Sequence, residues 1–245
     1  MSIKKIFGSQ KKEGEGEHWL SVGDLMAGLM MIFLLIAIVY MRMVVVERDR
    51  VRDVVVAWEQ TEESLYEDLK KEFKNDLEIW DAELERETLT VRFTEPDVLF
   101  RQGDTNIQER FKNILSDFFP RYISIIDTYP ICTYDLNDQS RGCIEEVRIE
   151  GHTSSEWSES VSPEEAYYLN MDLSQGRTRS VLRYSMNTID NNEFDWLESV
   201  IAAVGFSSAR TITDEHGKED KQLSRRVEFR VKTTVEKQLM RVIMD

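Results

Sequence analysis

A single acidic residue, Asp24, interrupts an otherwise apolar stretch near the start of the chain. The stretch runs from Trp19 to Met41 and reads WLSVGDLMAGLMMIFLLIAIVYM, which as a helix of roughly 34 Å would cross a bilayer. A carboxylate inside hydrocarbon costs at least ~2.5–3.5 kcal/mol, so it should face other helices and a water path. Because protonation would switch its charge, Asp24 is a candidate ion carrier. The alternative is an Asp that only caps or packs the first turn.

The apolar stretch predicts a permanent membrane anchor. It is too long for a cleaved signal peptide, and no small-residue cleavage site follows it. Four lysines precede the span and four arginines closely follow it, so the positive-inside rule leaves the orientation open. One span cannot form a channel, so partner helices are expected, and Ala27 and Gly28 would allow them to pack closely.

A second group of polar residues lies in the last third of the chain. Gly151–Ser154 (GHTS) follows an alternating stretch, and Asn170, Leu173, Ser174 and Arg177 lie in a segment with a helical pattern. Taken alone, this arginine is an ordinary residue of a helix surface. No G-x-S-x-G turn supports a hydrolase, so we assign no catalytic residue and expect no enzyme. Three histidines and two cysteines leave little material for a metal site, and none is assigned.

Composition excludes further classes of protein. The 245 residues carry 46 Asp and Glu against 31 Lys and Arg, a formal net charge of −15. Direct nucleic-acid binding would need a basic face, which this balance does not favour. At 41% hydrophobic residues, the chain can bury a core and is not wholly disordered.

The segment 42–88 predicts a long helix. It contains neither Gly nor Pro, and a continuous helix of about 40 residues would reach roughly 60 Å. Apolar residues recur every three, four or seven positions at Val51, Val55, Trp58, Leu65, Leu69, Phe73, Trp80 and Leu84. Such a stripe is consistent with a helix packed on its own domain or with a dimeric stalk, and we favour the stalk.

The rest of the chain predicts an α+β domain with about four strands. Alternating residues indicate strands beginning near Thr88, Ile144, Ala209 and Arg225. Helical patterns occur at 105–126, 170–184 and 193–204. The fold class is therefore a single transmembrane helix, a long helical stalk and an α+β domain.

Four segments of this domain carry a family resemblance. IEGHTSS, NMDLSQGRTRSVLRY, GFSSARTI and SRRVEFRV occur in this order and resemble the OmpA-like peptidoglycan-binding domain over about residues 90–235. The resemblance implies a domain that grips the diaminopimelate-containing stem peptide of the cell wall. Asn170, Leu173, Ser174 and Arg177 match its N-x-x-L-S-x-x-R motif, and Thr153 lies in the matching turn. Arg177 takes the position that pairs with the peptide carboxylate, a task that suits the guanidinium fork.

The chain departs from that family at one position of the turn. Ser154 stands where the family has an Asp that engages the ammonium group of diaminopimelate. The acidic loop that follows offers Glu156 or Glu159 as a substitute carboxylate.

The whole plan resembles MotB-type stator subunits, and the span SVGDLMAGLMMIFLLIAI is most similar to the ZorB subfamily of the Zorya anti-phage system. This implies a homodimer in a ring of ZorA-like (MotA-like) multi-span subunits at the bacterial inner membrane. Asp24 would carry H⁺, with Na⁺ as the alternative, and no cofactor is expected. A flagellar stator and a passive peptidoglycan tether remain alternative functions.

The same resemblance fixes the expected domain plan and compartments. It consists of a cytoplasmic tail (1–18), a span (19–41), a stalk (42–88), a periplasmic domain (89–235) and a C-terminal tail (236–245). Cys132 and Cys143 lie eleven positions apart within one loop, close enough to bridge. A periplasmic domain would favour a disulfide between them, whereas a cytoplasmic one would keep both thiols reduced.

Overall fold

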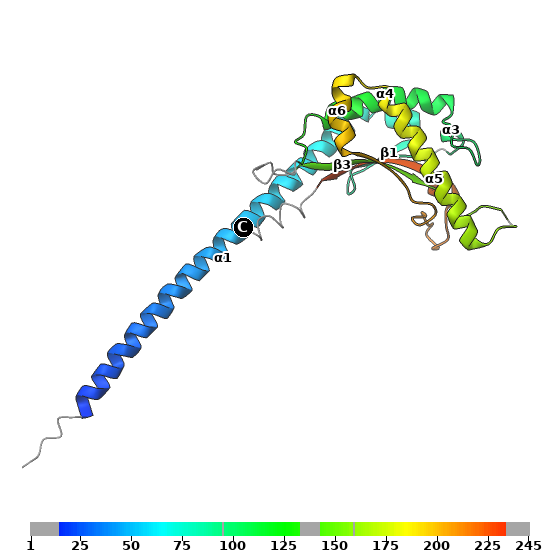
Figure 1. Cartoon of the computed structure of the whole chain (residues 1–245). Coiled ribbons are helices and arrows are strands. Elements are labelled where there is room, and N and C mark those ends of the chain that lie inside the picture. Colours follow the sequence, from blue (N-terminus) through cyan, green and yellow to red (C-terminus); the bar gives the residue numbers. More distant parts are fainter. Residues whose placement is uncertain (1–14, 95, 133–142, 159, 234–245) are drawn as a thin grey trace, which may run out of the picture. The chain divides into compact units, whose positions relative to one another are not determined.

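The computed structural model describes residues 15–94, 96–132, 143–158 and 160–233 (Figure 1). The chain divides into two compact units, Met1–Arg52 and Asp53–Asp245. One continuous helix, α1 (Glu15–Phe73), contributes residues to both units. The predicted tail 236–245 and most of the tail 1–18 lie outside the described residues.

The first unit contains the apolar part of α1. The described helix from Val22 to Phe73 includes a stretch that is long and apolar enough to cross a membrane, and none of that stretch is buried. Large apolar side chains such as Leu25 and Met31 are about three-quarters exposed. A helix with apolar residues on every side is suited to lipid or to partner helices, which agrees with the predicted span.

The second unit is an α/β domain whose elements follow α1 along the chain. They are α2 (Asp76–Trp80), β1 (Ala82–Glu85), β2 (Thr90–Phe93), α3 (Pro96–Leu99), α4 (Glu109–Ile126), β3 (Ile144–His152), α5 (Pro163–Met186), α6 (Asn191–Val200), β4 (Ile201–Gly205), α7 (Lys221–Ser224) and β5 (Arg226–Thr233). The described strands form one sheet in the order β1-β2-β5-β3-β4. β3 and β4 are parallel, and the other pairs are antiparallel. The predicted fold class is confirmed, with five strands in place of about four.

The core lies between the sheet and α4, α5 and α6, which cover one of its faces (Figure 1). Phe118 of α4 lies at its centre. Its ring centroid is 4.9–6.0 Å from those of Phe73, Trp80, Phe93, Tyr122 and Phe229. Because these rings come from α1, α2, β2, α4 and β5, one aromatic cluster joins elements from both ends of the domain.

The last turns of α1 belong to the domain, which corrects the prediction of a stalk that reaches residue 88. Leu65, Leu69 and Phe73 are fully buried in the core, and the indole nitrogen of Trp58 donates a hydrogen bond to Thr233 Oγ1 (2.8 Å). From Leu65 onward, the apolar stripe therefore packs on its own domain. The helix ends at Phe73, and the short helix α2 and the antiparallel pair of β1 and β2 follow it.

Two further predicted elements differ from the structure. Residues 201–204, predicted as the end of a helix, form β4, because pairing with β3 satisfies their backbone groups. The segment from Ala209, predicted as a strand, does not join the sheet. Its Ile212 instead exchanges backbone bonds with the following loop, receiving one from Asp220 N and donating one to Ser224 Oγ.

Cys132 and Cys143 form the expected disulfide, with Cα atoms 5.0 Å apart. Backbone bonds support it on both sides, from Cys132 N to Ile144 O and from Ile144 N to Pro130 O, each 2.8 Å. The bridge thus ties the segment after α4 to the residue that precedes β3. The polar loop between the cysteines, residues 133–142, lies outside the described residues.

The buried end of α1 leads to a stability prediction. Leu69→Ala should lower the free energy of unfolding of the domain by about 2–5 kcal/mol, because it removes a fully buried side chain and leaves a cavity. Lys71→Ala, at an exposed position two residues further on, should change it by no more than about 0.5 kcal/mol. Urea unfolding of the detergent-solubilised full chain measures both. Equal effects would show that this part of α1 is not part of the cooperative core.

Candidate functional site

The site is built at the start of α5, where the helix packs against the ends of two strands. Ser162 caps the helix, its hydroxyl accepting from Glu165 N (3.2 Å), and Pro163 follows at the first helical position. This is the capping-box spacing, which fixes where the helix begins. The motif from Asn170 to Arg177 therefore lies in the third to fifth turns of a well-defined helix.

Two glycines allow α5 to lie close to the sheet. A Cβ at Gly205, the last residue of β4, would lie 2.4 Å from the backbone nitrogen of Gln175. A Cβ at Gly151 in β3 would lie 2.6 Å from Thr178 Cγ2 and 3.0 Å from Ser174 O. Since the obstacles include helix backbone, larger residues at either position would push α5 away from the strand ends.

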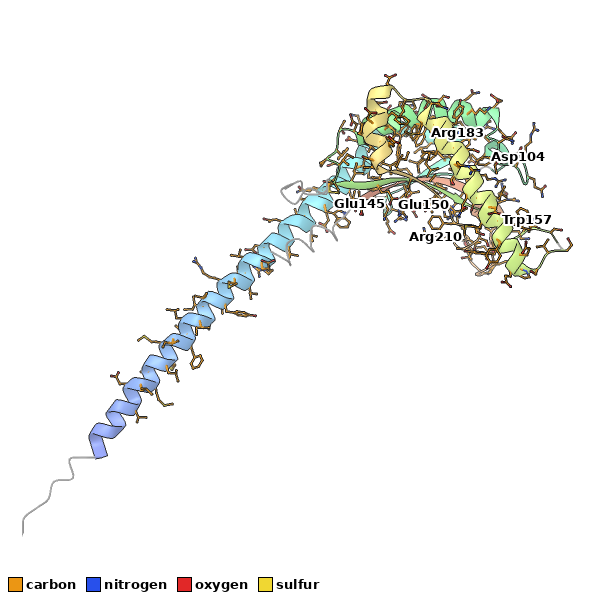
Figure 2. The ribbon with its side chains drawn as sticks, in the orientation of Figure 1. Asp104, Glu145, Glu150, Trp157, Arg183 and Arg210 are labelled. Carbon is orange, nitrogen blue, oxygen red and sulfur yellow. A yellow bond between two sulfur atoms is a disulfide. The ribbon has the colours of Figure 1, made fainter. Side chains whose placement is uncertain are left out.

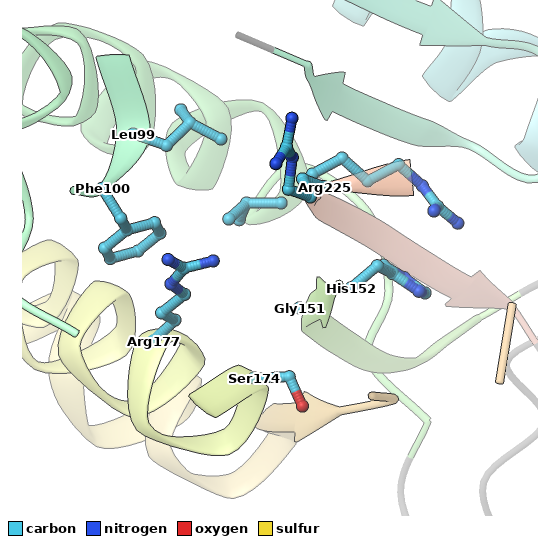
Figure 3. Close-up of a pocket in the computed structure, with 9 residues that line it drawn as sticks. Leu99, Phe100, Gly151, His152, Ser174, Arg177 and Arg225 are labelled. Carbon is cyan, nitrogen blue, oxygen red and sulfur yellow. The ribbon is translucent and has the colours of Figure 1, made fainter. Parts of the chain in front are cut away.

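A pocket of about 420 Å³ opens beside this contact. It is lined by Phe100, Gln102, Gly103, Thr153, Ser154, Glu156, Trp157, Asn170, Leu173, Arg177 and Arg225. A small adjoining cavity shares Phe100, Arg177 and Arg225 with this pocket (Figure 3). It also reaches Ser174, His152 and Arg226. The structure thus brings together all five residues predicted from the motif and the turn. Thr153, Asn170, Leu173 and Arg177 line the larger pocket, and Ser174 lines the smaller one.

Arg177 is held in place without a carboxylate partner. Its Nε donates to Asp104 O (2.9 Å), its Nη2 donates to Arg101 O (3.1 Å), and its guanidinium lies over the Phe100 ring at 4.8 Å. Burial, together with the charge of nearby Arg225, lowers the pKa of Arg177 to about 10. The side chain is therefore still charged at neutral pH, and no ion pair among the described residues neutralises it.

Two buried polar atoms at the pocket have no hydrogen-bond partner. They are Nε of Arg225, a donor, and Oγ1 of Thr153, which can donate or accept. Buried polar atoms are seldom left unpaired, because each costs about 1–3 kcal/mol. The pocket is consequently ready for a ligand that supplies acceptors, above all carboxylate oxygens.

Asn170 and Ser174 act on the shape of the site. The buried Asn170 side chain donates to Glu156 O (3.4 Å) and so holds the loop on the far side of the pocket. The Ser174 hydroxyl accepts from Ser207 N (3.0 Å) and donates to Met171 O (3.0 Å). Ser207 has a left-handed φ of 52°, so this bond stabilises the turn after β4.

Ser154 is buried at the pocket wall, where the resemblance would place an Asp. Of the two proposed substitutes, Glu156 lines the pocket, but its carboxylate pairs with Lys221 (3.3 Å). Glu159 lies outside the described residues. The described pocket wall therefore contains no carboxylate that is free of a cation.

Sequence reasoning missed Arg225, Trp157 and the turn at Gly103. Arg225 directly precedes β5, so strand alternation separates its side chain from that of Arg226 but does not show that Arg225 approaches α5. The other two residues come from loops whose distance from α5 cannot be judged by spacing. Gly103 is in the left-handed region (φ 67°), which lets the chain turn beneath Arg177.

A different cluster of charges lies on the opposite face of the sheet, which carries Glu150, His152 and Glu228. His152 Nε2 is 3.3 Å from Glu228 Oε2 and 3.7 Å from Glu150 Oε2, and Glu150 faces Arg210 (Figure 2). Ligand atoms of the three residues lie within 4.8 Å of one another, as in a metal site. However, Nε atoms of Arg226 (2.6 Å) and Arg92 (2.8 Å) already neutralise Glu228. The arrangement is therefore a buried ion network centred on Glu228, with His152 beside it.

Asp24 lies in the other unit. It is an exposed residue of α1, and its predicted role as ion carrier is not tested by the described contacts.

Comparisons with known proteins identify relatives of the chain. No protein-family model matches it. It is 47% identical to the Zorya protein ZorB of Escherichia coli, over 99% of this chain and 100% of that protein. Among solved structures, it is similar to a MotB-like protein from Desulfovibrio vulgaris, with a TM-score of 0.48 and 20% identity over 74% of this chain and 94% of that one. It is also similar to the T6SS cell wall anchor from Pseudomonas aeruginosa, with a TM-score of 0.43 and 17% identity over 68% and 97%.

The ion network predicts a pH dependence of stability. Burial would raise the pKa of Glu228, but His152 and Arg226 outweigh it and hold that pKa well below the usual range. A carboxylate with a depressed pKa stabilises the fold above about pH 4.3, its pKa in the unfolded chain, and this stabilisation is lost as pH falls below that value. Glu228→Gln should lower the free energy of unfolding by about 3–5 kcal/mol at pH 7, because it leaves the buried Arg226 without a carboxylate partner. Its free energy of unfolding should fall less on acidification than that of wild type.

Thermal unfolding of the full chain between pH 7 and pH 3 measures this difference. Glu198→Gln, at an exposed position of α6, is the matched control and should keep the wild-type acid profile. A Glu228→Gln protein with the same acid profile as wild type would contradict the assignment.

Proposed function

The chain belongs to the ZorB family of Zorya proteins and is not an enzyme, and from this premise we propose that it is a wall-anchored stator subunit of an ion-driven motor in anti-phage defence. The observation that carries the anchoring role is the pocket around Arg177. A guanidinium held by neutral carbonyls, next to the unpaired Nε of Arg225, is suited to a carboxylate. The stem peptide of peptidoglycan supplies carboxylates, and the motif Asn170–Arg177 matches the family that binds it.

We further propose an inner-membrane location, with the N-terminus in the cytoplasm and the second unit in the periplasm. The apolar stretch of α1 supports a single membrane span. The disulfide between Cys132 and Cys143 supports an oxidising compartment such as the periplasm. A wall-binding pocket also requires that side of the membrane.

The proposed motor function depends on Asp24. A carboxyl group within an apolar helix is costly unless protein or water surrounds it, so partner helices are required. We propose that two copies of the chain sit inside a ring of ZorA-like multi-span subunits, and that Asp24 accepts and releases a proton, with Na⁺ as the alternative. The ring would then turn against a stator fixed to the wall.

Arg177→Ala should weaken binding to purified peptidoglycan sacculi by about tenfold, because it removes the charged fork of the pocket. The affinity of Arg177→Lys for sacculi should lie between those of wild type and Arg177→Ala, since an ammonium keeps the charge but cannot bind bidentately. Co-sedimentation of the detergent-solubilised full chain with sacculi measures the apparent Kd of each protein.

Arg179→Ala is the matched control for this series. It removes an exposed arginine two residues along α5 and should bind sacculi as wild type does. Melting curves confirm that each variant is folded. Equal binding by wild type and both Arg177 variants would exclude this pocket as the wall site.

Asp24→Asn should abolish activity while leaving membrane insertion and sacculus binding intact, because the amide keeps the size of the side chain but cannot exchange a proton. Asp24→Glu, which keeps the carboxyl group, should retain part of the activity. The measurement is phage plaquing on cells that express each variant with its genomic neighbours, with motility scored in parallel. Full protection by Asp24→Asn would exclude the ion-carrier role and leave a passive tether, whereas loss of motility would point to a flagellar stator.

A further inference from the structure

We propose that the pocket binds a wall fragment through two carboxylate groups, one at Arg177 and one at Arg225. It makes no specific contact with the ammonium group of that fragment. This inference rests on the proposed wall-binding function and specifies its ligand class. It assigns Arg225 as a second ligand-binding residue, and it makes the ligand a dicarboxylate segment of the stem peptide whose amine faces solvent.

The first step is the surplus of positive charge. Arg177 and Arg225 line the same pocket, approaching it from α5 and from the residue before β5 (Figure 3). Two cations in a partly buried site repel each other, and an anion between them removes that cost. One carboxylate would neutralise one guanidinium and leave the other guanidinium without a counter-charge.

The second step concerns the donors still available. Arg177 uses Nε and Nη2 on the carbonyls of Asp104 and Arg101, so Nη1 is not committed to those bonds. Arg225 Nε is buried without a partner, and so is Oγ1 of Thr153. These groups come from three elements, so a single carboxylate would not satisfy all of them. Two carboxylates supply four acceptor oxygens.

The third step is the lack of an available acid to hold an ammonium group. Asp104 Oδ1 accepts from the backbone nitrogen (3.0 Å) and side-chain nitrogen (2.8 Å) of Asn106, and Asp104 does not line the pocket. Glu156 pairs with Lys221. Ser154, buried at the wall, offers only a neutral hydroxyl. An ammonium group placed here would meet two guanidinium groups and no uncommitted carboxylate among the described residues.

The test uses the soluble tripeptide L-Ala-γ-D-Glu-meso-diaminopimelate in three forms: with its side-chain amine free, with that amine acetylated, and with its diaminopimelate carboxylates amidated. Calorimetric titration of the wild-type full chain in detergent measures each Kd. Acetylation should change the Kd by less than about twofold, and amidation should weaken binding by about tenfold or more. A tenfold loss on acetylation would overturn the inference, because it would mean that the ammonium is read.

Two variants sharpen the test. Arg225→Gln should weaken binding of the unmodified peptide by about tenfold, whereas Arg179→Gln should leave the Kd for this peptide unchanged. Ser154→Asp should create a preference for the free amine, so that acetylation now weakens binding by about tenfold. An Arg225→Gln protein that is folded and binds as tightly as wild type would overturn the role of Arg225.

Sacculus binding separates this inference from the proposed function. Failure of wild type to bind either sacculi or any peptide would overturn the wall-binding function, and the inference with it. Sacculus binding combined with a strong loss on acetylation would overturn the inference alone. The wild-type comparison needs no substitution, so a misfolded variant cannot decide the outcome.

Discussion

The close approach of α5 to the ends of β3 and β4 determines the rest of the domain's binding face. It is possible only because Gly205 and Gly151 carry no side chain where helix atoms lie within 2.4–3.0 Å of a would-be Cβ. At this distance, Ser174 can accept a hydrogen bond from Ser207 N and hold the turn after β4. From the same helix face, Arg177 donates hydrogen bonds to the carbonyls of Arg101 and Asp104. These bonds hold its side chain in the pocket wall. The close packing that the two glycines allow thus sets the positions of the polar groups that would bind a ligand.

Buried charged side chains are paired differently on the two faces of the domain's sheet. On one face, Glu228 is neutralised by Arg92 and Arg226, with His152 close by. The charge of Glu228 is thus compensated within the fold. On the pocket side, no acid among the described residues forms an ion pair with Arg177 or Arg225. The contrast supports a binding role for the pocket, because Arg226 is neutralised by Glu228 whereas these two arginines have no such counter-charge.

The sequence predicts what depends on local spacing and misses what depends on packing. Asn170 to Arg177 lies on a helix because its motif follows a capping box at Ser162, and the two cysteines lie close because few residues separate them. The end of α1 was misinterpreted as a dimeric stalk. Apolar residues with helical spacing, such as Leu65 and Leu69, are equally suited to a dimer seam and to the core of a domain. β1 was missed because AELE has the composition of a helix, and only pairing with β2 makes it a strand. Arg225 could not be assigned to the pocket from spacing, since the loops that bring it there carry no periodicity.

The misinterpreted end of α1 is joined to the domain by apolar and charged contacts. α1 runs from Glu15 to Phe73, and its final residues lie in the second unit. Its last turns are held by the buried Leu65, Leu69 and Phe73, and Arg121 of α4 pairs with Glu72 (2.7 Å) and with Asp76 (2.8 Å) beyond the helix end. The last turns of α1 are therefore part of the domain's own core, and the apolar side chains that the sequence offered to a dimer seam stabilise the fold of one chain instead.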